Sequence, residues 1–167
     1  MKIIYEEAKP SDAKKVIEYL NIVASQSDNL TFGPNELMIN EVQEMELIKE
    51  INNDPNSLMI LAKDGEKIVG VASLSGNRKL RLRHRAEIGV SVLKDYWSQG
   101  IGSNLMSILI GYAIEAGIEI IDLEVVIENT NAIALYEKFG FEIIGTYKHF
   151  MKINDRYLDA HIMSLYL

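Results

Sequence analysis

The chain has 167 residues, a formal net charge of −7 and no cysteine, and 48% of its residues are hydrophobic. This length and composition suit one globular domain with a full-sized core, so we expect a single domain over residues 1–167. The lack of cysteine excludes disulfides, a thiolate nucleophile and thiolate metal sites, and the negative charge argues against nucleic acid as a partner.

Charged residues interrupt the start of the chain at once, which excludes a signal peptide. No apolar run approaches the roughly 20 residues that span a bilayer. We therefore expect a cytoplasmic protein with no membrane partner. His84, His149 and His161 lack the spacing of metal ligands, so no metal site is expected.

The first part of the chain predicts one strand and two helices. Residues 2–6 read as a short strand, and Ser11 is the expected cap of the helix that follows. Residues 25–35 are rich in Ser, Asp, Asn, Gly and Pro, which predicts a loop. A second amphipathic helix is expected over residues 36–51.

Strands are expected next, at residues 58–62 and 67–74, with the hairpin signal Asp64-Gly65 between them. Residues 78–85 alternate arginine with leucine and histidine, which predicts a hairpin strand with one solvated basic face. This run lies about ten residues, at ~3.3 Å each, from the glycine loop that follows, so we do not expect it to bind phosphate there.

Residues 87–102 have the layout of an anion-binding turn. They begin as an alternating strand and end in a loop that carries Gly100 and Gly102. An amphipathic helix follows, and Gly117 is its expected stop. Glycines allow close backbone approach, and the N–H groups of a helix's first turn face an anion. A dinucleotide fingerprint would need a third glycine where Leu105 stands.

The last part of the chain predicts a strand at residues 118–127 and a helix at residues 129–139 that Gly140 ends. A closing hairpin joins strands at residues 143–153 and 157–167. The expected order is βααβββαβαββ, in one mixed sheet with helices on both faces, which is an α/β (α+β) fold. The strands flanking the glycine helix should be parallel, because a helix joins them.

Residues 127–145 carry the pattern Asn-x-x-Ala-x-x-x-Tyr-x-Lys-x-Gly-Phe, which resembles the pantetheine-side motif of the GCN5-related N-acetyltransferase (GNAT) superfamily. The glycine loop is similar to that family's pyrophosphate arm, and the family's order of elements fits the one above. The resemblance implies a mostly antiparallel GNAT sheet, acetyl-CoA as cofactor, an amine as acceptor and N-acetyltransferase activity. The matching residues are Asn129, Ala132, Tyr136, Lys138, Gly140 and Phe141.

The resemblance also implies a cofactor site. In the family the two parallel strands splay apart beyond the glycine loop, and the pantetheine amides pair with the exposed strand edge. A backbone N–H of Val90 or a near neighbour would bind the thioester oxygen. The implied cofactor residues are Val90, Ser91 and Val92 of the edge, Trp97, Ser98, Gln99, Gly100, Ile101, Gly102 and Ser103 of the arm, and Asn129, Ala132 and Tyr136.

One residue departs from the family pattern. Trp97 stands where the family's arm usually has Arg or Gln. A phosphate contact from that position would have to come from Gln99 or Ser103 instead, with the backbone amides carrying most of the binding.

The resemblance implies three catalytic residues. Tyr136 matches the family's proton donor to the leaving thiolate, and its alternative role is core packing. Glu124 and Glu87 match carboxylates that act as the base in different branches, and either could instead be an ordinary strand carboxylate. Deprotonation by water alone also stays open.

The acceptor is not fixed by the sequence. By the family pattern its site includes Glu87, Glu124 and two aromatic candidates, Phe32 and Tyr157. Residues 145–163 resemble relatives that acetylate free amino acids, whereas relatives acting on protein N-termini, polyamines and drugs share the other motifs. A non-catalytic acyl-CoA-binding or sensor domain and a partner-binding module that uses the basic run are the alternatives, and such domains often form homodimers.

Overall fold

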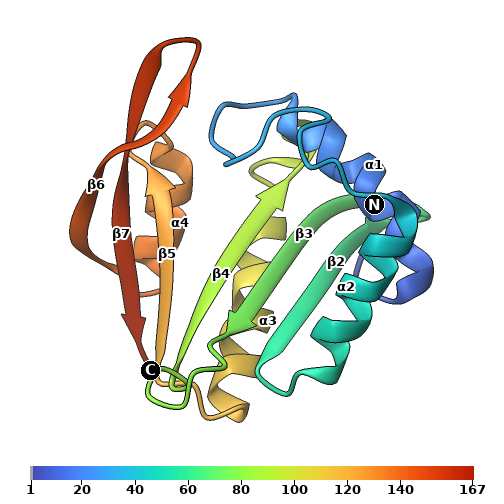
Figure 1. Cartoon of the computed structure of the whole chain (residues 1–167), viewed down its shortest axis with the longest axis horizontal. Coiled ribbons are helices and arrows are strands. Elements are labelled where there is room, and N and C mark those ends of the chain that lie inside the picture. The colour runs from blue at the N-terminus through green and yellow to red at the C-terminus, as the bar shows by residue number, and fades with distance from the viewer. Residues whose placement is uncertain (1) are drawn as a thin grey trace.

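The computed structural model describes residues 2–167 and contains one seven-stranded sheet with helices on both faces (Figure 1). The strands are β1 (Ile3–Glu7), β2 (Ser57–Asp64), β3 (Lys67–Gly76), β4 (Arg85–Val92), β5 (Ile120–Val126), β6 (Glu142–Ile153) and β7 (Arg156–Tyr166). The α-helices are α1 (Ala13–Ala24), α2 (Glu41–Asn53), α3 (Ile101–Glu115) and α4 (Thr130–Lys138). Short 3-10 turns cover Pro10–Asp12 and Lys94–Tyr96.

The strands lie in the order β1-β2-β3-β4-β5-β7-β6. β4 and β5 run parallel, and the other neighbouring pairs are antiparallel. α3 is the crossover that joins β4 to β5, as a parallel pair requires. The predicted order βααβββαβαββ and the predicted mixed, mostly antiparallel sheet are both confirmed.

Side-chain contacts place the helices on opposite faces of the sheet. A Cβ added to Gly70 of β3 would contact side chains of α3 at 3.1–3.3 Å. On the other face, the Tyr19 hydroxyl of α1 forms a 3.0 Å hydrogen bond with Ser91 Oγ of β4. Because side chains alternate along a strand, β4 directs Val90 towards α3 and Glu87 towards α1.

The glycines and turn residues that the sequence predicts to end helices or to join strands do so in the structure. Gly117 follows α3 with a φ of 76°, and Gly140 follows α4 with a φ of 93°. This left-handed conformation favours glycine, so both residues end their helices. Asn154 and Asp155 join β6 to β7 with φ values of 47° and 63°, as the expected hairpin turn requires.

Two helix starts differ from the sequence-based expectation. A 3-10 turn precedes α1, and Asp12 rather than Ser11 accepts a backbone hydrogen bond there, from Lys9 N at 2.8 Å. α2 begins at Glu41, later than predicted, because Asn40 caps it by accepting from the backbone of the first turn. The preceding loop is correspondingly longer.

The stretch between β3 and β4 is a compact loop, so the predicted basic strand is wrong. Leu82 N donates to Lys79 O at 2.8 Å, and Arg85 N donates to Leu82 O at 2.9 Å, which are turn hydrogen bonds. Alternating leucine and arginine resembles a half-buried strand, yet Leu80 is 76% exposed. Without a buried face, nothing fixes such a segment in a sheet.

Two glycines give opposite predictions for stability. An added Cβ at Gly76 would lie 2.5 Å from Asn56 Cβ and Asn56 O, so Gly76→Ala is expected to lower the free energy of unfolding by about 1–3 kcal/mol. At Gly111, within α3, nothing lies within 4 Å of the added Cβ, so Gly111→Ala should raise it by about 0.5–1 kcal/mol. Urea unfolding measures both, and a Gly76→Ala protein as stable as the wild type would contradict the close contact.

Candidate active site

The hydrogen-bonded ladder between β4 and β5 is short. Its pairs are Arg85 with Ile120, Ala86 with Ile121, and Glu87 with Asp122. Past this point the two strands part, as Figure 1 shows. The parting therefore begins within β4, earlier than the expected position beyond the glycine loop.

Past Glu87, β4 presents free backbone groups along one edge. Leu93 N donates to Val69 O at 2.9 Å, so the odd-numbered residues of β4 direct their N–H and C=O groups to β3. The backbone groups of Val90 and Val92 consequently point to the opposite edge, where β5 has turned away. Ser91 instead directs its backbone to β3 and its hydroxyl to α1.

Trp97 already occupies one of these edge groups. Its indole Nε1–H donates to Val92 O at 2.7 Å, and the side chain is 43% exposed. The residue that departs from the family pattern thus binds the last carbonyl of the free edge. An extended ligand that pairs with β4 is left with the C=O of Ile88, the N–H and C=O of Val90 and the N–H of Val92. The family pattern gave no signal for this bond.

The start of α3 is an uncapped helix N-terminus. Gly100 precedes the helix with a φ of 80°, which favours glycine. No side chain of the described chain caps this helix, whereas Asn40 and Asn129 cap α2 and α4. The N–H groups of residues 101–103 lie at the positive end of a 15-residue helix, which suits an anion.

Side chains in the turn before α3 hold its backbone. Gln99 Nε2 donates to Asp95 O at 3.1 Å, so this candidate for a phosphate contact is engaged within the turn. Lys94 N donates to Gln26 Oε1 at 2.8 Å, which ties the turn to the loop after α1. Gln26 was not anticipated, because 68 residues separate the two partners.

α4 lies beside the glycine loop. A Cβ added to Gly102 would lie 3.3 Å from Leu135 Cδ2, so the start of α3 packs against α4. Asn129 caps α4 through Oδ1, which accepts from Ala132 N at 3.4 Å. Tyr136 is the next residue after Leu135, and the structure therefore brings the two matched motifs together.

Tyr136 is a buried phenol. Its side chain is 8% exposed, and its ring lies 5.8 Å from that of Phe141, centroid to centroid. Burial raises the pKa of Tyr136 to about 12. The hydroxyl consequently stays protonated at neutral pH, the state in which it can donate a proton.

Glu87 and Glu124 lie on the same face of the sheet, towards α1. Glu87 pairs with Asp122, and Glu124 comes two positions later on β5, so three carboxylates share this face. Glu124 is exposed to solvent, yet partial desolvation raises its pKa, and the charges of Glu87 and Asp122 raise it further. No salt bridge engages either glutamate in residues 2–167. Once deprotonated, either carboxylate can accept a proton from a neighbouring amine.

An ion pair on the same two strands as these glutamates was not predicted from the sequence. Arg85 Nε and Nη2 donate to Asp122 Oδ2 and Oδ1 at 2.9 and 2.8 Å, and Ser164 Oγ donates to Oδ1 at 2.6 Å. Arg85 was expected on a solvated face, yet it bridges β4 and β5 next to the last pair of the ladder. No local pattern predicts this bond, because 37 residues separate its partners.

The two aromatic candidates for the acceptor site lie near one end of the sheet. Phe32 is half-buried in the loop between α1 and α2, which reaches the same end as the β6–β7 hairpin (Figure 1). Tyr157 is 52% exposed and stacks on His149 with 4.2 Å between ring centroids. Ile162 is opposite Glu124, so Tyr157 lies roughly 16 Å farther along β7 and is not brought beside the glutamates.

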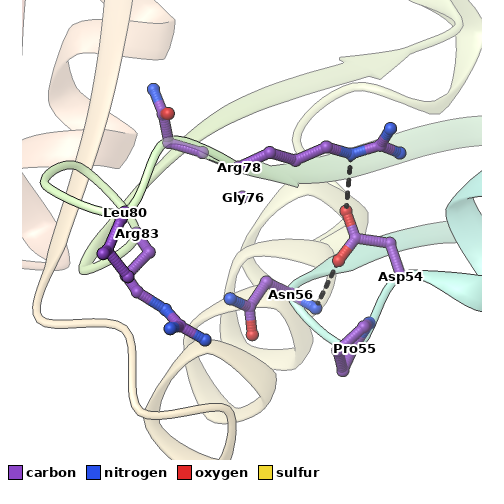
Figure 2. A pocket seen from close by; sticks show the side chains of 8 residues that line it. Asp54, Pro55, Asn56, Gly76, Arg78, Leu80 and Arg83 are labelled. Carbon is purple, nitrogen blue, oxygen red and sulfur yellow. Dashed lines mark hydrogen bonds and ion pairs between the residues drawn. The ribbon is translucent and has the colours of Figure 1, made fainter.

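A cavity of about 290 Å³, drawn in Figure 2, lies where β4 begins, whereas the glycine loop lies beyond the end of that strand. Arg78 points at Asp54 there, with 3.7 Å between Nε and Oδ2. The turn before β2, the end of β3 and the loop before β4 form it, so it is not part of the candidate active site. Its lining residues are Asp54, Pro55, Asn56, Gly76, Asn77, Arg78, Leu80 and Arg83.

Residues 2–167 contain neither a metal-ligand cluster nor a membrane-spanning helix. This part of the chain holds no group of three or more His, Cys, Asp or Glu that could bind a metal ion. None of its helices is long and apolar enough to cross a membrane. His161 Nδ1 is buried without a hydrogen-bond partner in these residues, and its side chain lies on the sheet face opposite Glu124.

Known proteins share this sequence pattern. Residues 24–141 match the model of the Acetyltransferase (GNAT) family. The L-amino acid N-acetyltransferase AaaT of Escherichia coli (strain K12) is 32% identical over 107 residues, which is 64% of this chain and 65% of that enzyme. The ribosomal protein bS18-alanine N-acetyltransferase of the same organism is 37% identical over 76 residues, 46% of this chain and 51% of that enzyme. The chain thus spans less than two thirds of these relatives.

Solved structures share the whole fold. An acetyltransferase of the GNAT family from Streptococcus pneumoniae is 26% identical with a TM-score of 0.96, over 99% of this chain and 100% of that one. The protein yncA from Salmonella typhimurium, solved with its cofactor acetyl-CoA, is 18% identical with a TM-score of 0.87. That match covers 100% of this chain and 95% of the other, and it shows the fold alone.

The uncapped start of α3 gives a prediction for CoA binding. Gly102→Asp places a carboxylate where an anion would approach, so the affinity for CoA should fall on the order of 100-fold, the scale of a like-charge contact. The rise in melting temperature that CoA causes in the wild type should disappear accordingly.

Gly102→Ala is the control for this substitution. It adds the same Cβ against Leu135 without the charge, and a flexible leucine tip at 3.3 Å can give way. The alanine variant should retain most of the CoA affinity. Undiminished CoA binding by Gly102→Asp would show that the pyrophosphate binds elsewhere.

Proposed function

Because the chain belongs to the acetyltransferase (GNAT) family, whose cofactor is acetyl-CoA, we propose that it transfers an acetyl group directly to a primary amine. The amine is that of a small molecule such as an amino acid, or a protein N-terminus, and the relatives' names include both kinds of acceptor. The observation that carries the proposal is the free edge of β4, which leads into the uncapped start of α3 beside two glutamates without ion pairs.

The residues around this edge fit the cofactor. Pantetheine carries two amides, and the free backbone groups of Val90 and Val92 can pair with them as with an added strand. The N–H groups of residues 101–103 suit the pyrophosphate. Asn129 keeps its amide N–H groups for the pantetheine arm while its Oδ1 caps α4. The proposed site also keeps Ser91, Trp97, Ser98, Gln99, Gly100, Ala132 and Tyr136.

Acetyl-CoA, when bound, supplies the thioester carbonyl carbon that the amine attacks. An ammonium has no lone pair, so a base must first remove its proton. Glu124 is the proposed base, because partial desolvation and its neighbours Glu87 and Asp122 raise its pKa and make its carboxylate a stronger proton acceptor. Glu87, on the same face, is the alternative base.

Two further groups act on the reacting atoms. The N–H of Val90, which points to the free edge, can stabilise negative charge that develops on the thioester oxygen. Tyr136 donates its proton to the departing thiolate, and its raised pKa keeps that proton in place until then.

A non-catalytic acyl-CoA-binding or sensor domain is the alternative function. Such a domain needs the edge of β4 and the start of α3, but it needs neither a protonated phenol nor unpaired carboxylates. The chain has all of these groups, which favours catalysis. Turnover of acetyl-CoA across a panel of amines separates the two functions.

Tyr136→Phe tests the proton donor. The substitution keeps the ring that packs on Phe141 and removes the hydroxyl, so kcat should fall roughly 10- to 1000-fold, the scale of losing one general acid, with CoA affinity nearly unchanged. Tyr147→Phe removes a hydroxyl from a half-exposed tyrosine on β6 and should leave kcat unchanged. Wild-type turnover by Tyr136→Phe would reduce Tyr136 to a packing role.

Glu124→Gln and Glu87→Gln together identify the base. Free alkyl amines are mostly protonated at neutral pH and the pKa of Glu124 is raised, so log(kcat/KM) should rise with pH towards a plateau as these groups lose their protons. Because part of this rise belongs to the amine itself, only the comparison of the two variants identifies the base. If Glu124 is the base, Glu124→Gln should be slow at pH 7 and recover partly at high pH, where the amine arrives neutral. Glu87→Gln should then change KM at most.

Two other outcomes would change the assignment of the base. Slow turnover confined to Glu87→Gln would assign the base to Glu87. Two variants that match the wild type at every pH would show that no protein base is needed and that the amine loses its proton to water.

A further inference from the structure

On the sheet face where the amine would arrive, β4 and β5 together carry one guanidinium and three carboxylates. The register of β4 against β5 and the alternation of side chains direct all four towards α1. On β7, the residues opposite Asp122 and Glu124 are Ser164 and Ile162, which carry no charge. On β4 and β5, the charged residues of this face are Arg85, Glu87, Asp122 and Glu124.

Arg85 is held by Asp122. Its Nε and Nη2 donate to the two carboxylate oxygens at 2.9 and 2.8 Å, a bidentate geometry that is among the stronger hydrogen-bonded pairs. Ser164, which is fully buried, fixes the carboxylate from the other side at 2.6 Å. The guanidinium is therefore engaged within the sheet and does not face an incoming ligand as a free cation.

The two glutamates have no comparable partner among residues 2–167. On the same face of β7, the cationic residue is Arg156. It lies roughly 20 Å along the strand from Ile162, the residue opposite Glu124. A substrate carboxylate next to the reacting amine would therefore be repelled by Glu87 and Glu124, and β4, β5 and β7 offer no free cation nearby to offset this repulsion. A free α-amino acid places its carboxylate in that unfavourable position.

We propose that Asp122, by occupying Arg85, makes the acceptor site selective for amines that have no adjacent carboxylate. Peptide N-termini and amino-acid amides share this chemistry, and free α-amino acids lack it. The inference rests on the proposed function, since the amine must be acetylated beside Glu87 and Glu124. Asp122 is a positioning residue in this scheme, because it acts through Arg85.

The wild-type enzyme provides the first test. Several amino acids are each offered as the free acid, as the primary amide and as the first residue of a tripeptide amide. For each substrate, kcat/KM is calculated from the concentration of its neutral amine form, which corrects for differences in amine pKa. The amides and peptides should exceed the free acids at least 10-fold. Equal or better use of the free acids would overturn the inference while supporting the proposed function. No turnover of any amine would overturn both.

Asp122→Asn provides the second test. It releases Arg85 to meet a ligand carboxylate, so the ratio of kcat/KM for amide over free acid should fall at least 10-fold. Ser164→Ala removes the other hydrogen bond to Asp122 and leaves Arg85 held, so its ratio should stay at the wild-type value. A merely structural role for Asp122 would lower kcat/KM for both substrates equally and leave the ratio unchanged, which would overturn the inference.

The double variant Arg85→Gln/Asp122→Asn covers the case in which Asp122→Asn alone does not fold. It removes both charges and retains hydrogen-bonding groups on both strands. Because it has no guanidinium to release, its ratio should remain like that of the wild type. A double variant that prefers free acids would show that Arg85 and Asp122 do not control the choice, and would overturn the inference.

Discussion

The parting of β4 from β5 after Glu87 and Asp122 is the constraint on which the candidate active site depends. Backbone N–H and C=O groups that lose a strand partner must find another, in water or in a ligand. Arg85 and Asp122 join the two strands next to the last pair of the ladder, so the opening begins at a defined residue. Past it, the edge of β4 and the start of α3 offer unpaired groups in one continuous stretch of chain.

That continuity explains why the cofactor side could be predicted from the sequence. A strand, a glycine loop and a helix start follow one another directly, and Gly100 adopts its left-handed conformation as a local property. Gly117 and Gly140 end their helices for the same reason, so the order of elements was also predictable. Trp97 is the exception, because its bond to Val92 O depends on how the turn folds back on the strand.

The acceptor side could not be predicted to the same extent, because residues far apart in the chain form it. The bond between Arg85 and Asp122 follows from the β4–β5 register, which no short pattern specifies. The basic run before β4 was misread for a related reason. Its alternation is compatible with a strand, but a strand also needs a partner and a buried face, and Leu80 in the loop has neither.

Desolvation, nearly complete for the buried Tyr136 and partial for the exposed Glu124, has opposite consequences for the two groups that the proposed mechanism uses. It disfavours the charged form of each, and so raises the pKa of both Tyr136 and Glu124. For the phenol this preserves the proton that a leaving thiolate needs, and for the carboxylate it strengthens the base that an ammonium needs. Tyr136 belongs to α4, which packs against the start of α3, whereas Glu124 faces α1. In the proposed mechanism a proton is therefore removed on one face of the sheet and supplied from the other, and the parting between β4 and β5 lets the amine and the leaving thiolate meet at one thioester.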